Sequence, residues 1–223
     1  TEACRQAANI RDFATEVAWE TGLHVEVISA EEEARLALAG CRPLLGGEEP
    51  HALLFDIGGG STEVIWLDTS GPPRILDTLS LPVGVVTLAE RYHGGGLTAS
   101  DYEAVIAEFR PDLVAFDRSN GISAQIARGA VQMVGSSGTV TTLAGINMGL
   151  ARYDRSLVDG SWLLQSDAVG VSRRLLELGL EARGRLPCIG RDRADLVVGG
   201  CALLEAIVTL WPVPRLRVAD RGV

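Results

Sequence analysis

Three consecutive glycines between two strand-like apolar segments constrain this chain more than any other feature. The segments ALLFDI and TEVIWL flank Gly58, Gly59 and Gly60 within the stretch DIGGGSTEV. Ordering glycine costs more backbone entropy than ordering any other residue, so three ordered glycines indicate a backbone approach that a Cβ would prevent. A phosphate held by backbone N–H groups of Gly58 to Ser61 is one explanation, and a plain hairpin turn is the other. The stretch alone leaves both open.

A second glycine loop follows a predicted strand later in the chain. The segment AVQMVG leads into Gly135, Ser136, Ser137, Gly138 and Thr139, and the helical pattern TVTTLAGINMG continues from there. Such a loop presents backbone N–H groups, hydroxyls and the positive end of a helix dipole to one point. An ordinary strand-to-helix turn is the structural alternative. If the two loops face each other across a cleft, they can clamp one phosphate chain.

Two acids adjoin the first loop. Asp56 ends the strand before the glycines, and Glu63 begins the strand after them. Carboxylates in these places suit Mg²⁺, which prefers hard oxygen ligands and bridges to phosphate oxygens. A turn-initiating aspartate and a solvent-facing strand glutamate are the structural alternatives.

A helix with an acidic first turn is predicted after Ser29. Ser29 and Glu32 have capping-box spacing, so the Glu32 side chain is expected to reach back to the backbone. Glu33 has small neighbours, Ala30 and Ala37, at i−3 and i+4. A carboxylate among small apolar residues at a cleft edge can have a raised pKa and act as a general base. The alternative is an acidic turn that only favours the helix dipole.

The order of patterns predicts an α/β protein in two parts. A helical pattern over 2–21 ends at Gly22, the alternation in 23–29 predicts a strand, and the Pro- and Gly-containing segment 41–51 is the best linker. Beyond it we expect an antiparallel meander of three strands and then further helices and strands. Pro111 is expected to kink or split the helix over 97–119, and Gly199-Gly200 to break the last helix.

Charge excludes two classes of partner. The chain has 223 residues and a net charge of −9, with no Lys/Arg-rich run, which argues against nucleic acid and anionic membranes. An anionic substrate therefore needs local positive potential. No apolar run has the roughly 20 residues of a membrane span, and no C-x-x-C pair occurs, so we expect a cytoplasmic protein with reduced thiols. The opening without Met suggests a start inside a larger protein.

The chain contains six ordered blocks: TEACRQAANIRDF, TGLHVEVISAEEEARL, FDIGGGSTEV, LPVGVVTLAERY, VGSSGTVTTLAG and RLRVADRGV. Together they resemble the exopolyphosphatase and guanosine pentaphosphate phosphohydrolase family, within the actin, sugar-kinase and heat-shock ATPase superfamily. The resemblance implies hydrolysis of a terminal phosphoanhydride bond of inorganic polyphosphate or guanosine pentaphosphate. It also implies ribonuclease-H-like domains with a cleft between them, and Mg²⁺ as cofactor. The oligomeric state stays open, a homodimer included.

The resemblance also implies roles for single residues. Glu33 matches the base that activates water, Asp56 and Glu63 match the metal- and water-organising acids, and Arg5 matches a phosphate-contacting arginine. Gly58 to Ser61 and Gly135 to Thr139 match the phosphate loops. The family's opening D-x-G-S-N-S block is missing, so residues 1–48 are expected to be the C-terminal portion of a first ribonuclease-H-like domain and 49–223 a nearly complete second one. The chain alone is then expected to be almost inactive.

Two other functions remain open at this point. VVGGCALLEAI resembles the Gly-Gly adenosine-binding turn of ATP-dependent kinases and actin-like ATPases, although Gly199-Gly200 can equally be a close helix contact. A non-catalytic sensor of polyphosphate or a guanosine polyphosphate would keep the loops and need no base.

Overall fold

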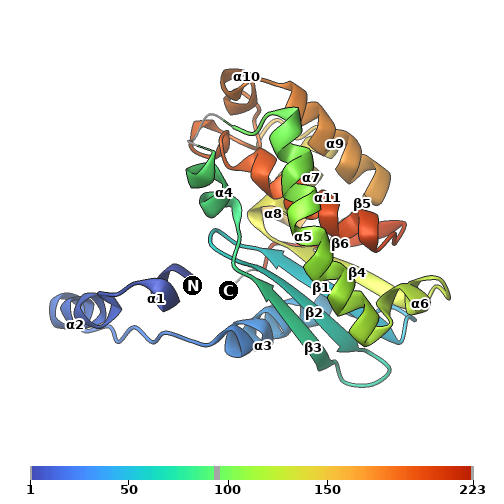
Figure 1. Ribbon diagram of the computed structural model, residues 1–223, viewed down its shortest axis with the longest axis horizontal. Helices are drawn as coiled ribbons and strands as arrows, with labels where there is room; N and C mark the ends of the chain where they lie inside the picture. Colours follow the sequence, from blue (N-terminus) through green and yellow to red (C-terminus); the bar gives the residue numbers. More distant parts are fainter. Residues whose placement is uncertain (1, 93–95, 222–223) are drawn as a thin grey trace.

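A six-stranded mixed sheet forms the centre of the molecule (Figure 1). The computed structural model describes residues 2–92 and 96–221. The strand order is β3-β2-β1-β4-β6-β5, in which β1, β2 and β3 form the predicted antiparallel meander, β4 is parallel to β1 and β6, and β5 is antiparallel to β6. The strands are β1 (His51–Ile57), β2 (Thr62–Asp68), β3 (Arg74–Leu81), β4 (Val131–Ser136), β5 (Trp162–Leu164) and β6 (Arg215–Ala219).

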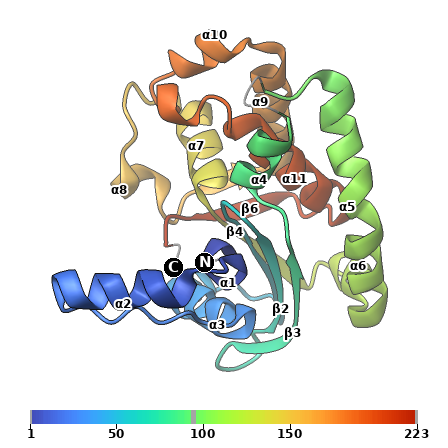
Figure 2. The ribbon, with the colours of Figure 1, turned by 60° about the vertical axis from the view of Figure 1, so that its left-hand side comes forward.

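Helices cover the two faces of the sheet unequally (Figures 1 and 2). The long helices α5, α7, α9 and α11 form a layer on one face, and α3 packs on the other. The helices are α1 (Glu2–Gln6), α2 (Ile10–Thr21), α3 (Ala30–Cys41), α4 (Val85–Arg91), α5 (Ala99–Asn120), α6 (Ile122–Ile126), α7 (Gly138–Asn147), α8 (Arg155–Val158), α9 (Gln165–Glu177), α10 (Leu180–Gly184) and α11 (Val197–Leu210), with short 3-10 turns η1 (Arg42–Leu44) and η2 (Arg191–Arg193).

The central strand β1 is buried on both faces, which fixes α3 against the sheet. Phe55 faces the large core under the helix layer, whereas Leu54 faces a smaller core shared with Ala34 and Ala37 of α3. Small side chains on α3 allow this helix to approach the sheet closely. Glu33, next to Ala34, is thereby held near the end of β1.

The first thirty residues differ from the prediction. The expected single helix is two helices, α1 and α2, although Gly22 does end α2 in the left-handed conformation with φ 73°. The predicted strand at 23–29 is wrong, because these residues have no regular secondary structure and join no strand in the described part of the chain. Alternating apolar residues form a strand only where a neighbouring strand provides partners for their backbone hydrogen bonds. Thr1 lies outside the described residues.

The predicted break at Gly199-Gly200 is wrong, and so is a split at Pro111, whereas a kink at Pro111 stays a prediction. Helix α5, which starts with the expected Thr98–Asp101 capping box, continues through Pro111. Pro111 and the residue whose carbonyl it leaves unbonded, Ala107, are both exposed, so water can hydrate that carbonyl while the buried face holds the helix together. Helix α11 likewise continues through Gly199-Gly200. None of the helices in the described ranges is both long and apolar enough to cross a membrane.

Candidate active site

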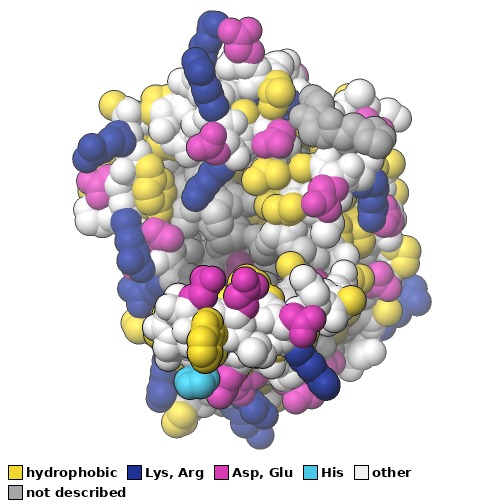
Figure 3. All heavy atoms as spheres, turned by 90° about the vertical axis from the view of Figure 1, so that its left-hand side faces the viewer, with side chains coloured by type: hydrophobic (Ala, Val, Ile, Leu, Met, Phe, Trp, Pro, Cys, Tyr) yellow, Lys and Arg dark blue, Asp and Glu magenta, His cyan; other side chains and the backbone are white. Residues whose placement is uncertain are grey.

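A cleft of about 390 Å³ lies where α1 and α3 meet the β1–β2 loop and the start of α7. Figure 3 shows this hollow, with Asp and Glu side chains along one rim. The cleft therefore brings together segments from both predicted domains; the boundary between residues 48 and 49 stays a prediction. Its lining residues are Glu2, Glu33, Asp56, Ile57, Gly58, Gly59, Gly60, Ser61, Glu63, Val85, Ser137, Gly138, Thr139, Thr142, Ile189, Arg193, Leu196 and Val197.

The first glycine loop is both a hairpin turn and a wall of the cleft. The Gly58 N–H donates to the Ser61 carbonyl at 2.9 Å, which closes the turn between β1 and β2. The first turn of α4 then docks on the loop, because Val85 N–H donates to the Gly58 carbonyl at 3.0 Å and Val86 N–H to the Gly59 carbonyl at 2.9 Å. These bonds leave little freedom in the loop, so its shape is set before any ligand arrives.

The second loop is shorter than predicted. Ser137, Gly138 and Thr139 line the cleft at the start of α7, and Ser137 Oγ caps the helix by accepting from Val140 N–H at 3.2 Å. Gly135 and Ser136 belong to β4 instead. A Cβ on Gly135 would lie 2.7 Å from the Phe55 ring, so this glycine is required by packing rather than by a ligand. Ser136 is buried beneath the loop.

Asp56 and Glu63 lie side by side in the floor of the cleft, as paired residues of β1 and β2. Burial, followed by the charges of Glu63 and Glu33, raises the pKa of Asp56 to about 7. Burial also raises the pKa of Glu63, and hydrogen bonds from Ser61 and Ser80 oppose this shift. The pair is thus a concentrated negative charge that favours either a proton or a cation.

Glu33 lies at the cleft in an ion pair, rather than among apolar neighbours alone. Arg5 Nη1 donates to Glu33 Oε2 at 2.6 Å, and Arg5 Nε donates to Glu2 Oε2 at 2.8 Å. Arg5 is thus held by two carboxylates behind the cleft wall. Ser29 caps α3 as predicted, but Glu32 does not reach back to the backbone; it pairs with Arg35 at 3.2 Å. The exposed helix face gives Glu32 this cationic partner one turn away.

The carboxylates at the cleft fit a magnesium site of the kind completed by substrate. Across the described ranges, no three His, Cys, Asp or Glu side chains gather as a ready metal cage. Mg²⁺ is commonly held by one or two carboxylates and takes its other ligands from water and substrate phosphates. Asp56 and Glu63 provide such a pair, and burial, together with the neighbouring carboxylates, raises the pKa of both groups.

Two charged cleft residues were not predicted from the sequence. Glu2 lines the cleft and anchors Arg5. Arg193, at the end of η2, approaches the second loop: its Nη1 is 3.7 Å from where a Cβ would be on Gly138. No ion pair engages Arg193 within the described part of the chain. The only signal for it was a pair of arginines directly before the last helix.

The sequence pattern of the Ppx/GppA phosphatase family matches residues 1–223. The chain belongs to this family. It is 29% identical over 187 residues to exopolyphosphatase 2 of Mycobacterium tuberculosis, covering 83% of the chain and 56% of that relative. The chain thus spans about half the length of the curated relatives it matches.

Solved structures of other Ppx/GppA proteins share the fold. An exopolyphosphatase from Cytophaga hutchinsonii superimposes with a TM-score of 0.83 at 25% identity, over 99% of this chain and 69% of the other. The Aquifex aeolicus family member gives a TM-score of 0.76 at 26% identity, over 99% and 68%. The predicted α/β class with an actin-like fold is confirmed.

Proposed function

We propose that the protein containing this chain is an exopolyphosphatase-type phosphohydrolase that releases terminal orthophosphate from inorganic polyphosphate, with guanosine pentaphosphate as a second candidate substrate. One observation carries the proposal: Glu33, Asp56 and Glu63 face the same cleft as two loops built from glycine and serine. Membership of the Ppx/GppA phosphatase family supports the reaction class.

The loops supply the positioning that phosphoryl transfer needs. Backbone groups of Gly58 to Ser61 and of Ser137 to Thr139 would hold the terminal phosphate from two sides, and Ser137 can still donate its hydroxyl proton while its oxygen caps α7. Arg193 would add positive charge beside the second loop. Positioning and electrostatic stabilisation supply most of the rate in such reactions, so little covalent chemistry is required of the protein.

Glu33 is the proposed general base. Arg5 holds one of its carboxylate oxygens, Oε2, which orients the group and leaves Oε1 for the attacking water. Asp56 and Glu63 would hold Mg²⁺, which would neutralise charge on the phosphate oxygens. This arrangement explains how a chain of net charge −9 can bind a polyanion: the attraction is local to the cleft.

The kinase alternative loses its supporting motif. Gly199 and Gly200 lie inside helix α11, where Gly199 packs on Leu88 and Gly200 on Thr139. A close helix contact explains both glycines without an adenosine.

The test is phosphate release by the full-length protein from polyphosphate and from guanosine pentaphosphate in parallel, with Mg²⁺ varied. The proposal expects release that depends on Mg²⁺ and uses water as the acceptor. Transfer from ATP to a small molecule would support the kinase instead, and binding of either compound without turnover would support a sensor.

A further inference from the structure

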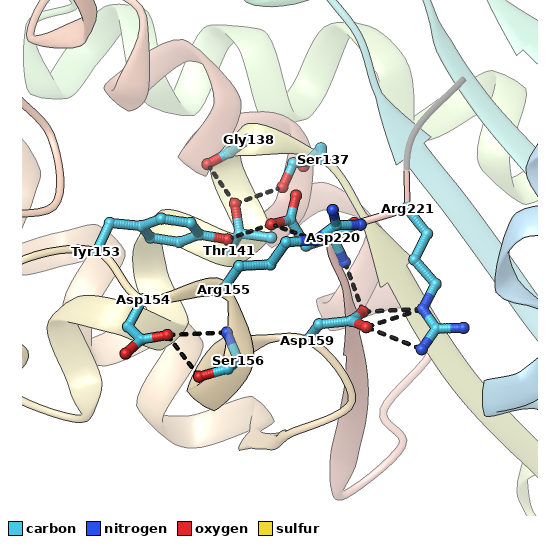
Figure 4. A network of polar contacts seen from close by, with 10 residues as sticks. All are labelled: Ser137, Gly138, Thr141, Tyr153, Asp154, Arg155, Ser156, Asp159, Asp220 and Arg221. Atoms are coloured by element: carbon cyan, nitrogen blue, oxygen red, sulfur yellow. Dashed lines mark hydrogen bonds and ion pairs between the residues drawn. The ribbon is translucent and has the colours of Figure 1, made fainter.

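A network of polar and packing contacts links the second cleft loop to the end of β6 (Figure 4). Thr141 Oγ1 donates to the Ser137 carbonyl at 3.0 Å, and the Tyr153 hydroxyl lies beside the Thr141 side chain. The Tyr153 ring also packs on α7, because its Cδ2 is 3.8 Å from where a Cβ would be on Gly145. The Tyr153 hydroxyl donates to Asp220 Oδ2 at 2.6 Å. The first turn of α7, which presents the loop, is therefore tied to Asp220.

Asp220 is itself fixed on two further sides. Arg155 Nη2 donates to the Asp220 carbonyl at 2.6 Å, and the Asp220 N–H donates to Asp159 Oδ1 at 3.1 Å. Burial and the bond to Asp220 raise the pKa of Tyr153 to about 12, so the phenol remains a donor at neutral pH. The Tyr153–Asp220 hydrogen bond thus connects the segment packed on α7 to Asp220, which Arg155 and Asp159 hold in place.

The next residue, Arg221, reaches the helix that carries Glu33. Its Nε donates to Asp159 Oδ2 at 2.9 Å, and its backbone oxygen lies only 2.8 Å from where a Cβ would be on Gly40 of α3. Gly40 is seven residues, or about two helical turns, after Glu33 and so lies on the same side of α3. The Asp220-Arg221 dipeptide consequently contacts α3 directly and α7 through Tyr153.

We propose that Tyr153 and Asp220 are positioning residues that hold the Ser137–Thr139 loop in register with the helix bearing Glu33. Neither is among the described residues that line the cleft, so they act through α7 and not by touching substrate. The inference rests on the proposed function, because its consequence is the placement of a phosphate against the base. A displacement of about 1 Å in such a placement can cost as much as 100-fold in rate.

The test is Tyr153→Phe in the full-length protein, which keeps the ring and removes the hydroxyl. We expect KM for polyphosphate to rise about five- to tenfold, in line with the loss of one hydrogen bond that orders the loop. KM is the informative quantity, because a variant that merely folds less well has fewer active molecules and an unchanged KM. A KM equal to that of the unmodified protein would overturn the inference.

Two further variants sharpen the result. Asp154→Ala is the matched control: Asp154 lies beside Tyr153 in sequence but only caps α8, accepting from Ser156 N–H at 2.9 Å. Its KM should not change, and an equal increase there would assign the effect to the segment as a whole and overturn the inference. Asp220→Asn keeps an oxygen that can accept from Tyr153 but removes the charge, so its KM should lie between those of the unmodified protein and Tyr153→Phe. A KM as high as that of Tyr153→Phe would support the role of the carboxylate, and an unchanged KM would count against it.

Failure of the proposed function is separable from failure of this inference. If the full-length protein releases no phosphate from polyphosphate, the proposed function is wrong. The positioning role is then judged by calorimetric binding of tripolyphosphate to the same variants. Tyr153→Phe should weaken binding about five- to tenfold while Asp154→Ala leaves it unchanged, and equal affinities would reject it.

Discussion

Asp56 and Glu63 are directly opposite partners in the antiparallel ladder of β1 and β2, on either side of the three-glycine loop. Like charges in directly opposite strand positions destabilise a sheet. Here the two carboxylates are also withdrawn from water, which raises the pKa of both. The hairpin therefore holds an unfavourable charge pair that a proton or a cation would relieve, so we expect the stability of the protein to depend on pH and on a bound cation.

Stability without metal should fall as the pH rises. The pKa of Asp56 is about 7 in the folded protein against its ordinary value of 3.8, so the folded state binds the proton more tightly than the unfolded state. The stabilising contribution is complete below about pH 3.8 and is lost as the pH rises through 7, with an upper size of about 4 kcal/mol. Asp56→Asn cannot ionise and should gain about 1 to 3 kcal/mol over the unmodified protein at pH 8.

The measurement is urea unfolding in EDTA at pH 5 and pH 8. The advantage of Asp56→Asn should be larger at pH 8 than at pH 5. An advantage of the same size at both pH values would show that Asp56 does not titrate in this range.

Binding of Mg²⁺ should release a proton near neutral pH. Asp56 must be deprotonated to hold the ion, so the apparent affinity for Mg²⁺ should increase as the pH rises from 6 to 8. Calorimetry in two buffers of different ionisation enthalpy measures the proton directly. Asp56→Asn should remove both the proton and most of the affinity; tight binding of Mg²⁺ by this variant would place the ion elsewhere.

The glycine pair in α11 should matter for packing against the second loop. A Cβ on Gly200 would overlap Thr139 Oγ1 and lie 3.0 Å from Thr139 Cβ, so Gly200→Ala should destabilise the protein by about 1 to 3 kcal/mol and disturb the loop. Gly170, in the exposed part of α9, has no atom within 4 Å of its Cβ position. Gly170→Ala should therefore stabilise by about 0.5 to 1 kcal/mol.

The measurement is the free energy of unfolding of both variants, by thermal or chemical denaturation. If Gly200→Ala is as stable as Gly170→Ala, Gly200 of α11 does not pack closely against Thr139 of α7.

Local signals in the sequence predicted most of the secondary structure. Three successive strand-like segments predicted the meander of β1 to β3, and the cap residues Gly22, Ser29 and Thr98 mark helix ends as expected. The errors share a cause: in 23–29, at Pro111 and at Gly199-Gly200, the outcome depends on what lies next to the segment in space. The pattern of residues along one segment does not show which other segment will pack against it.

In the candidate site, too, local features could be predicted from the sequence, whereas features that depend on neighbours in space could not. Glycine loops and flanking acids were visible because their chemistry is local, and Asp56, Glu63 and Glu33 do face one cleft. Glu2 and Arg193 were missed because a single charged residue looks solvated until the fold closes around it. Gly135 was assigned to the loop because its packing against Phe55 could not be foreseen from its position before Ser136.

The most direct test of the central claim compares Glu33→Gln with Glu32→Gln in the full-length protein. Both are neutral replacements in the first turn of α3, but only Glu33 lines the cleft, and glutamine at 33 can still accept from Arg5. We expect Glu33→Gln to lower phosphate release from polyphosphate by about 100- to 10,000-fold while tripolyphosphate still binds, and Glu32→Gln to release phosphate at the unmodified rate. An unchanged rate for Glu33→Gln would remove the general base and contradict the account.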